Sequence, residues 1–454
     1  MPGKSGRGAR QPGSGQPVLG SPTDVLDPYL PDNGNLGYRI SRYDLDLMYK
    51  VSGNRLEGTA TLTATSHIDL RRFSLDLANT LTVTRVSVND KRVRYSHRNK
   101  KLTITSADPI PPGGAMTIVV RYHGSPRPIR GSWGEVGWEE LTEGALCANQ
   151  PNGAASWFPC DDHPIAKAPY RISITTDSPY YALANGVLES KRARAAQTTW
   201  VYHQVEPMPT YLASIQIGPY KKVSLATKPL PVDAVIPPRL TKNFDVDFGR
   251  QLEMIDVFVE MFGPYPFPRY TVVVTDDPLE IPIEAQSFST FGANHCNGTR
   301  DSERLVAHEL AHQWFGNSVT LARWRDIWLH EGFACYAEWL WSQRSGGRSA
   351  DEWARHYYQK LAASPVRVPL ADPGPRKMFD DWVYKRGAIT LHALRLTIGD
   401  GNFFALLHRW TEKYRYGSVT TEDFIALAAN FSSTPLQDLW QRWLFTPALP
   451  PFPS

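Results

Sequence analysis

Hydrophobic and polar residues alternate with a period of two over the first half of the chain, from about Tyr38 to Val223. A period of two places every second side chain on the same face of a strand. The runs are short and are separated by Gly, Pro, Asn and Asp, as in YDLDLMYKV, GTATLTATS and AMTIVVRYH. Short alternating runs between turn residues are typical of antiparallel sheets. We therefore predict an antiparallel β domain at residues 26–225.

The pattern changes in the second half. A proline-rich crossing, TKPLPVDAVIPPRL, follows Val223, and we place the domain boundary within it. A helix is predicted at 245–261, and YTVVVTDD after it indicates a strand. From Ser302 onward apolar residues recur every three or four positions, which is the period of amphipathic helices. These helices are predicted at 302–317, 330–344, 350–362, 382–398, 402–414, 421–430 and 435–445. We expect a mostly helical second domain at residues 226–454 and a multidomain α+β fold.

Composition and charge narrow the classes of partner. With 454 residues, 42% hydrophobic and 21% charged, the chain is long enough for two or three domains with sizeable cores. The formal net charge is only +4, and no Lys/Arg cluster interleaves with aromatic residues, so we expect no nucleic acid partner. No apolar run is long enough to cross a bilayer, so we expect no membrane association.

Cysteine usage and the first residues predict the compartment. The four cysteines, Cys147, Cys160, Cys296 and Cys335, are widely spaced and form no CxxC pair. That spacing argues against a disulfide framework and against a thiolate zinc site. Residues 1–25 are rich in Gly and Pro and lack an apolar core, so they are predicted to be a disordered tail and not a signal peptide. We expect a cytoplasmic protein.

The segment LVAHELAHQWFGNSV carries two histidines, His308 and His312, four residues apart. Residues at this spacing share one face of a helix, so both imidazoles can bind one metal ion. Glu309 lies about 100° around the helix axis from His308, because a helix has about 3.6 residues per turn. That position is suited to a carboxylate that takes a proton from a water beside the metal.

A third ligand is required, because catalytic zinc sites use three protein ligands and keep one open position. Glu331, in WLHEGFACYAEWL, follows His312 after eighteen intervening residues, enough for a loop and the start of a second helix. The neighbouring His330 would point away by the rotation of one residue, so we assign Glu331 as the ligand. Glu338 is seven residues further along and returns to nearly the same face, where it could hold a ligand histidine.

The alternative is a buried helix that carries histidines by chance, since a lone HExxH is a weak signal. The glutamate on a second helix favours the zinc site, because the two features are independent. Four tryptophans surround the two helices, and we expect them to pack there and not to bind substrate. We also expect Cys335 to be a small buried residue. These tryptophans are Trp314, Trp324, Trp328 and Trp339.

HELAH, the eighteen-residue gap and HEGFACYAEWL together resemble the gluzincin zinc aminopeptidases, the family of aminopeptidase N and leukotriene-hydrolase relatives. The resemblance also covers residues 150–174, 206–218 and 383–395, with the sequences QPNGAASWFPCDDHPIAKAPYRISI, EPMPTYLASIQIG and VYKRGAITLHALR. It implies a saddle-like N-terminal β-sandwich followed by a thermolysin-like catalytic domain. The last residues resemble the end of that domain, so we expect a short form without the C-terminal helical domain and with a more open cleft.

The resemblance also assigns roles. It implies that His308, His312 and Glu331 hold one zinc ion per chain and that Glu309 is the general base. Tyr384 would donate a hydrogen bond to the oxyanion. Two further residues would contact the substrate's free α-amino group: Glu284 binds it, and Gln150 assists.

The amine-binding strand departs from the family pattern. The family has Gly-Ala-Met-Glu-Asn where this chain has IPIEA, so Ile281, Pro282 and Ala285 replace the glycine, alanine and asparagine. The family's strand also binds substrate through its backbone, and Pro282 has no N–H to donate. The resemblance therefore does not determine the shape of the first substrate pocket, which receives the N-terminal residue of the peptide.

The function that the resemblance implies is a monomeric zinc aminopeptidase acting on peptides with a free N-terminus. Two alternatives are a zinc hydrolase of another substrate class, such as an epoxide hydrolase, and a catalytically inactive scaffold. The scaffold reading predicts loss of a ligand, the base or the tyrosine, and all five residues are present in the sequence.

Overall fold

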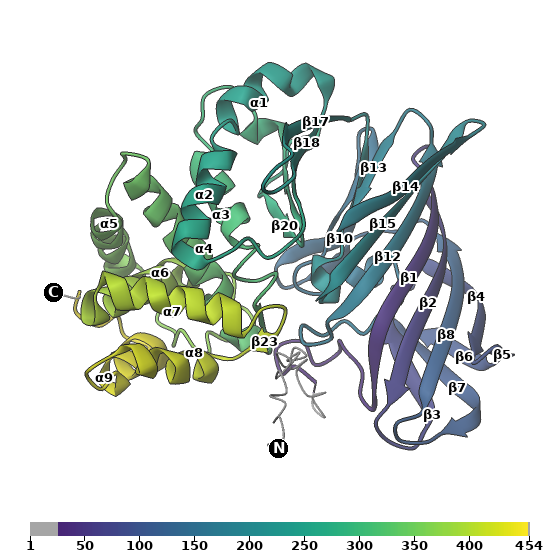
Figure 1. The fold of residues 1–454 in the computed structure, drawn as a ribbon. Coiled ribbons are helices and arrows are strands. Elements are labelled where there is room, and N and C mark those ends of the chain that lie inside the picture. The colour runs from purple at the N-terminus through teal and green to yellow at the C-terminus, as the bar shows by residue number, and fades with distance from the viewer. Residues whose placement is uncertain (1–25, 453–454) are drawn as a thin grey trace, which may run out of the picture.

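The computed structural model describes residues 26–452, so the predicted disordered tail at 1–25 lies outside the described residues. A strand-rich body formed by the first half of the chain lies beside a mainly helical body formed by the second half (Figure 1). The predicted α+β class, with a β domain followed by a mostly helical domain, is confirmed.

The largest sheet of the β body has eight strands in the order β14-β15-β12-β1-β2-β8-β4-β5. Its neighbours are antiparallel except for β1 and β12, which run parallel. A long stretch of chain separates β1 from β12, and that length allows the parallel pairing. The strands are β1 (Tyr38–Lys50), β2 (Arg55–Ser66), β4 (Leu81–Val88), β5 (Lys91–Arg92), β8 (Ala115–Gly124), β12 (Ala168–Asp177), β14 (Val187–Arg194) and β15 (Gln197–Met208).

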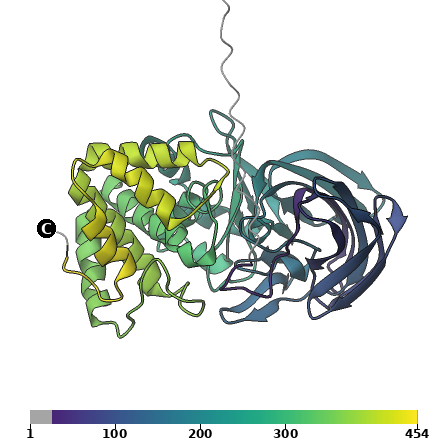
Figure 2. The same cartoon turned by 90° about the horizontal axis from the view of Figure 1, so that it is seen from below.

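Two smaller sheets complete the β body, in the orders β13-β16-β11-β10-β9 and β3-β7-β6. The large sheet curves around them (Figure 2). Alternate residues of β2 and β12 are buried, as the period of two predicts. The strands are β3 (Leu70–Asp76), β6 (Arg94–Arg98), β7 (Lys101–Ile110), β9 (Ile129–Gly131), β10 (Gly134–Leu141), β11 (Gly144–Ala148), β13 (Tyr181–Ala184) and β16 (Ile215–Gly218).

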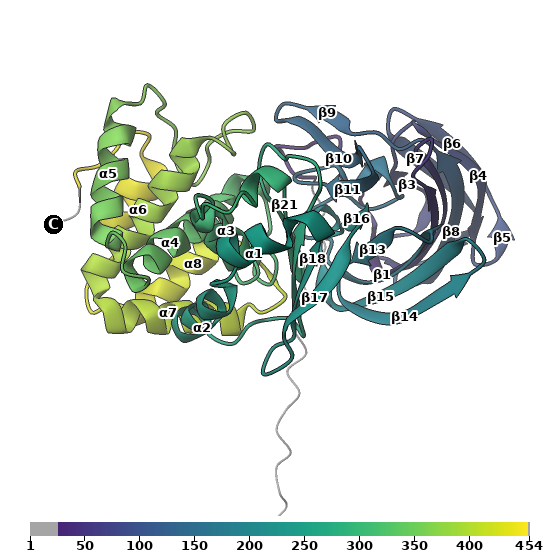
Figure 3. The ribbon, with the colours of Figure 1, turned by 90° about the horizontal axis from the view of Figure 1, so that it is seen from above.

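A five-stranded sheet with the order β17-β18-β19-β21-β20 lies between the β body and the helices (Figure 3). Its strands are β17 (Lys221–Ala226), β18 (Val232–Ile236), β19 (Tyr270–Val274), β20 (Ile283–Ala285) and β21 (Phe288–Phe291). The proline-rich crossing therefore contains strand structure. The domain boundary predicted after residue 225 falls at the end of β17, which pairs with β18. The boundary itself stays a prediction.

The predicted helix 245–261 is two helices, α1 (Thr241–Asp247) and α2 (Gln251–Phe262). Gly249 lies between them, and a Cβ at this position would be 2.3 Å from the Asp245 carbonyl oxygen. The backbone is too tight there for a side chain, so the single predicted helix was wrong at this point.

The remaining predicted helices are present, with two differences. The helix predicted at 302–317 ends at Ala311, and Gly316, with a φ of 125°, lies in the turn that follows it. The one predicted at 435–445 is a short α-helix followed by a π-turn at 441–445. The helices are α3 (Glu303–Ala311), α4 (Trp328–Arg344), α5 (Ala350–Ala363), α6 (Asp381–Ile398), α7 (Asp400–Lys413), α8 (Thr421–Ala428) and α9 (Gln437–Trp440), and the two-stranded sheet of β22 (Thr320–Leu321) and β23 (Ser418–Val419) lies among them. Across residues 26–452, no helix combines the length and apolar character needed to cross a membrane.

Helices α4 and α6 cross at a pair of glycines. A Cβ on Gly332 would lie 2.9 Å from the Cα of Gly387, and a Cβ on Gly387 would lie 2.8 Å from the Cα of Gly332. Contacts this short leave no room for any side chain. Gly332 directly follows Glu331, and Gly387 lies three residues after Tyr384. The crossing therefore fixes the distance between two residues that the sequence assigns to the site.

We predict that Gly387→Ala lowers the free energy of unfolding by about 1–3 kcal/mol, because the added methyl group overpacks the crossing. The measurement is a denaturant-unfolding curve followed by circular dichroism. Gly401→Ala is the matched control, since Gly401 lies in α7 with nothing within 4 Å of its Cβ position. The control should be neutral or slightly stabilising. Equal midpoints for the two variants would show that the glycine crossing is not tight.

Candidate metal centre

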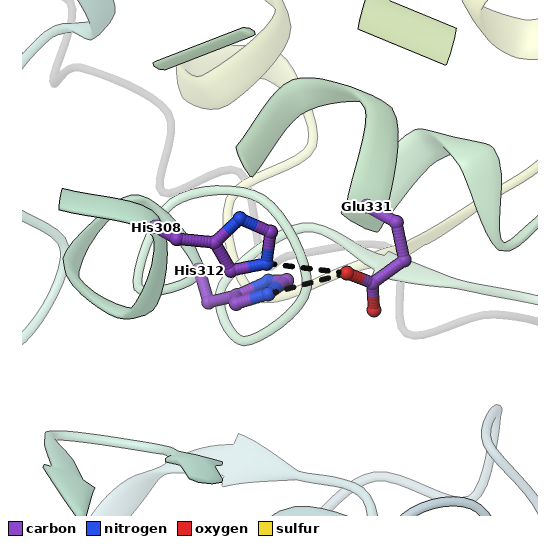
Figure 4. A group of neighbouring side chains, drawn as sticks. All are labelled: His308, His312 and Glu331. Atoms are coloured by element: carbon purple, nitrogen blue, oxygen red, sulfur yellow. Dashed lines mark ion pairs between the residues drawn. The ribbon is translucent and has the colours of Figure 1, made fainter. Parts of the chain in front are cut away.

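Three side chains from two helices converge on one point (Figure 4). His308 lies in α3, His312 caps the C-terminus of α3, and Glu331 lies in the first turn of α4. The Nε2 atoms of His308 and His312 are 3.4 and 3.6 Å from the same Glu331 oxygen, Oε2. His312 keeps helical φ and ψ although α3 ends one residue earlier, so the spacing of four residues still places both rings on one side.

Hydrogen bonds at the opposite ring nitrogens fix both imidazoles. His308 Nδ1 lies 2.7 Å from Glu338 Oε1, and Arg304 donates to the other oxygen of the same carboxylate at 2.9 Å. His312 Nδ1 lies 3.0 Å from the Phe315 carbonyl oxygen. A carbonyl oxygen can only accept, so Nδ1 of His312 is the donor and its Nε2 is the atom that faces the metal position. The group therefore offers two imidazole nitrogens, each oriented by a hydrogen bond at the other ring nitrogen, and one carboxylate. This donor set fits a zinc ion with one open coordination position.

Charges within the group favour a cation at its centre. Burial lowers the pKa of His312, but the neighbouring Glu331 carboxylate outweighs this effect and raises the pKa to about 10. Burial raises the pKa of Glu331, and the two histidines outweigh it and bring that pKa below its usual range. In the absence of a metal, a proton on the histidine therefore supplies the positive charge that the buried carboxylate requires.

Glu309 has the environment of a general base. It is buried, and its Oε2 atom has no hydrogen-bond partner among the described residues. Oxygens of Glu309 and Glu284 and a ring nitrogen of His312 all lie within 4.8 Å of one another. Burial is the largest cause of the raised pKa of Glu309 and of the raised pKa of Glu284, which is about 7. The two carboxylates therefore line the space next to the ligand group.

Tyr384 projects from α6 toward the same group. Its ring is stacked on the His308 ring, with centroids 6.1 Å apart and planes inclined by 13°. Burial, followed by the charge of Glu331, raises the pKa of the phenol well above its usual range. The hydroxyl is therefore a neutral hydrogen-bond donor at working pH.

The two residues assigned to the substrate amine lie in different parts of the fold. Glu284 is on β20, an edge strand that pairs with β21. Gln150 follows β11 in the β body, and its amide nitrogen is buried without a hydrogen-bond partner in the described part of the chain. Ile281, just before β20, is 69% exposed, so the altered strand presents an apolar side chain to solvent.

The neighbours of the assigned residues have other roles. His330 accepts a hydrogen bond from the Leu321 N–H at 2.7 Å, and burial lowers its pKa to about 3, so it is a neutral residue outside the ligand group. Cys335 is fully buried. Each of the four tryptophans named above is at most 1% exposed, as expected for packing.

The sequence interpretation missed Arg304 and Gln313. Arg304 lies four residues before His308, and this helical spacing could have indicated that it reaches the same carboxylate. The Gln313 side chain donates to the Ala285 carbonyl at 3.1 Å and accepts from the Ser287 N–H at 2.9 Å, so it joins the end of α3 to the β20–β21 hairpin. No local pattern could have indicated that contact, because it depends on how the two segments pack.

Comparison with known proteins assigns the family. Residues 40–212 match the Peptidase M1 N-terminal domain, and residues 246–443 match the Peptidase family M1 domain. The chain belongs to peptidase family M1. The gluzincin resemblance seen in the sequence is thereby confirmed.

Curated M1 relatives are longer than this chain. It is 28% identical to glutamyl aminopeptidase of Homo sapiens over 65% of this chain and 33% of the relative. It is 26% identical to tricorn protease-interacting factor F2 of Thermoplasma acidophilum over 68% of this chain and 42% of the relative. The chain thus spans about a third to two fifths of the length of these relatives.

Solved M1 structures of similar length also match. An M1 zinc metallopeptidase from Deinococcus radiodurans is 31% identical, with a TM-score of 0.85 over 94% of this chain and 99% of that chain. A mutant of it bound to a Tyr-Ser-Ala substrate gives a TM-score of 0.86 at 30% identity. The M1 family implies zinc, in agreement with the donor set described above.

We predict that zinc binding to this M1 chain releases a proton, because the metal must displace the proton from His312, whose pKa is about 10. The apparent zinc affinity should then rise about tenfold per pH unit between about pH 7 and 9. Competition with a chromogenic chelator, corrected for the chelator's own protonation, measures this slope. A zinc affinity that does not change with pH over this range would contradict the assigned charge state.

Proposed function

We propose that this chain is a zinc-dependent aminopeptidase that removes N-terminal residues from peptides. The observation that carries the proposal is the placement of two further carboxylates, Glu309 and Glu284, beside the histidine and glutamate ligands. One carboxylate is suited to activate water and the other to bind the substrate's amine. The names of the M1 relatives, which include aminopeptidases from several organisms, support the same class of reaction.

His308, His312 and Glu331 would hold the zinc ion. When bound, zinc supplies a Lewis acid that polarises the scissile carbonyl and lowers the pKa of the attacking water. The hydrogen bonds that the two imidazole rings donate to the Glu338 carboxylate and to the Phe315 carbonyl hold the rings in place.

Glu309 takes a proton from the attacking water and later passes it to the leaving amine. Its unpartnered oxygen leaves it free to accept that proton. Burial raises the pKa of Glu309 above its usual range, which makes the carboxylate a stronger base toward the water proton.

Tyr384 stabilises the oxyanion that forms from the carbonyl oxygen. The high pKa of its phenol keeps the proton in place, and a neutral donor aimed at developing negative charge lowers the barrier. Its stacking on the ring of His308 positions the hydroxyl beside the ligand group.

Glu284 anchors the substrate's α-ammonium group, which restricts cleavage to the first peptide bond. A cation next to this buried carboxylate would favour its charged form. The unpartnered amide of Gln150 is the second polar group assigned to the amine. The exposed Ile281 would lie at the edge of the first substrate pocket, where it favours apolar contacts.

The alternatives have less support. A scaffold role would not preserve the base and the tyrosine with all three ligands, and no feature of the site favours an epoxide over a peptide. We also propose a cytoplasmic location, because the four cysteines are unpaired and buried, as expected in a reducing compartment.

We predict that Glu309→Gln and Tyr384→Phe each lower kcat for aminoacyl-arylamides by about a hundredfold or more while zinc content stays at one per chain. The measurement combines steady-state kinetics with metal analysis of the same samples. Glu57→Gln, an exposed site on β2, is the matched control and should leave kcat unchanged. Parent-like turnover in either site variant would remove that residue from the mechanism.

A further inference from the structure

Lys167 belongs to the WFPCDDHPIAKA run, a motif to which the proposed reaction assigns no role. It lies in the β body, one residue before β12, and its side chain extends into the catalytic body. It is only 3% exposed. A buried lysine between the two bodies needs an explanation, because removing an ammonium group from water is costly.

Among residues 26–452, the Lys167 Nζ atom donates only to oxygens of the catalytic body. It donates to the Thr320 hydroxyl at 2.9 Å and to the carbonyls of Ser318, Gly417 and Asn317 at 3.0, 3.2 and 3.3 Å. All four acceptors are uncharged. Carbonyl and hydroxyl oxygens therefore surround the Lys167 Nζ atom, and its hydrogen bonds hold them together at one place.

Three of these acceptors lie in one segment, residues 313–320, which we call the post-helix turn. This turn begins directly after His312, and it contains the Phe315 carbonyl that binds Nδ1 of His312. The Asn317 N–H also donates to the His312 carbonyl at 3.0 Å. The position of the turn therefore sets the orientation of a metal ligand.

The post-helix turn also reaches the amine-binding strand. The Asn317 side chain donates to the Ala285 carbonyl at 3.0 Å, one residue after Glu284. A second group from the β body, the Tyr211 hydroxyl, donates to the Gly316 carbonyl at 3.2 Å. Gly316 packs closely under the ligand, since a Cβ at this position would be 3.2 Å from Nδ1 of His312.

We infer that Lys167 is a positioning residue through which the N-terminal domain fixes the post-helix turn, and with it the His312 ring and the amine-binding strand. The expected effect of Lys167 on turnover rests on the proposed function. The expected effect of Lys167 on metal binding rests only on the assignment of His312 as a ligand. The N-terminal domain thereby takes part in metal binding although it supplies no ligand.

The test is Lys167→Met in the full chain, which keeps the apolar stem of the side chain and removes the amine that makes the four hydrogen bonds. We expect zinc affinity, measured by chelator competition without substrate, to fall by about tenfold to a hundredfold, as for other residues that orient a ligand. The visible absorption spectrum of the cobalt-substituted protein should shift, because the His312 ring changes its orientation. With aminoacyl-arylamides, kcat should fall about tenfold and KM should rise by about twofold or more, because the amine-binding strand loses its support as well. Lys167→Arg, which restores a cation, should recover part of the zinc affinity.

Thr142→Val is the matched control. The Thr142 hydroxyl donates to Asp277 at 2.5 Å, so this variant also loses a hydrogen bond between the two bodies, but away from the post-helix turn. It should keep parent zinc affinity and the parent cobalt spectrum.

Parent-like zinc affinity and an unchanged cobalt spectrum in Lys167→Met would overturn the inference, whatever happens to its melting temperature. If that variant does not fold, Lys167→Gln takes its place under the same criteria, because its side chain is one bond shorter and its amide keeps only two N–H donors. The two metal readouts need no substrate. Failure of the aminopeptidase proposal would therefore appear as inactivity of the parent protein and would leave this test intact.

Discussion

The convergence of two imidazole nitrogens on one buried glutamate oxygen is the constraint on which the rest of the structure depends. His308, His312 and Glu331 come from two helices, and a zinc site tolerates little error in their placement. The Gly332–Gly387 contact holds α4 against α6, and Glu338 holds the His308 ring. Each of these contacts helps to hold the buried histidines and Glu331 close together.

The β body contributes to this arrangement from outside the catalytic helices. Lys167 and Tyr211 bind the turn that follows His312, and Gln150 places an unpartnered amide in the interior. We therefore propose that the N-terminal domain, without supplying a metal ligand, affects both metal geometry and substrate binding. This dependence gives a physical reason for two domains to pack as closely as they do here (Figure 1).

Much of the ligand group was predictable because helix geometry is local. The spacing of His308 and His312 fixes their shared face, and the register of α4 separates Glu331 from His330. The break between α1 and α2 and the end of α3 at Ala311 were missed, since apolar spacing does not indicate where a helix ends and the close approach of Gly249 to the Asp245 carbonyl is seen only in the structure. The contacts of Lys167 were also beyond prediction, because the residues it joins are 150 or more positions apart along the chain.

The most direct test of the central claim is the product pattern from one peptide in two forms. A heptapeptide with a free N-terminus and its N-acetylated counterpart are incubated with the protein and followed by mass spectrometry, with and without a chelator. The account predicts stepwise loss of N-terminal residues from the free peptide alone, abolished by the chelator and restored by one equivalent of zinc. Internal cleavage, equal cleavage of the acetylated peptide, or activity that survives removal of the metal would contradict it.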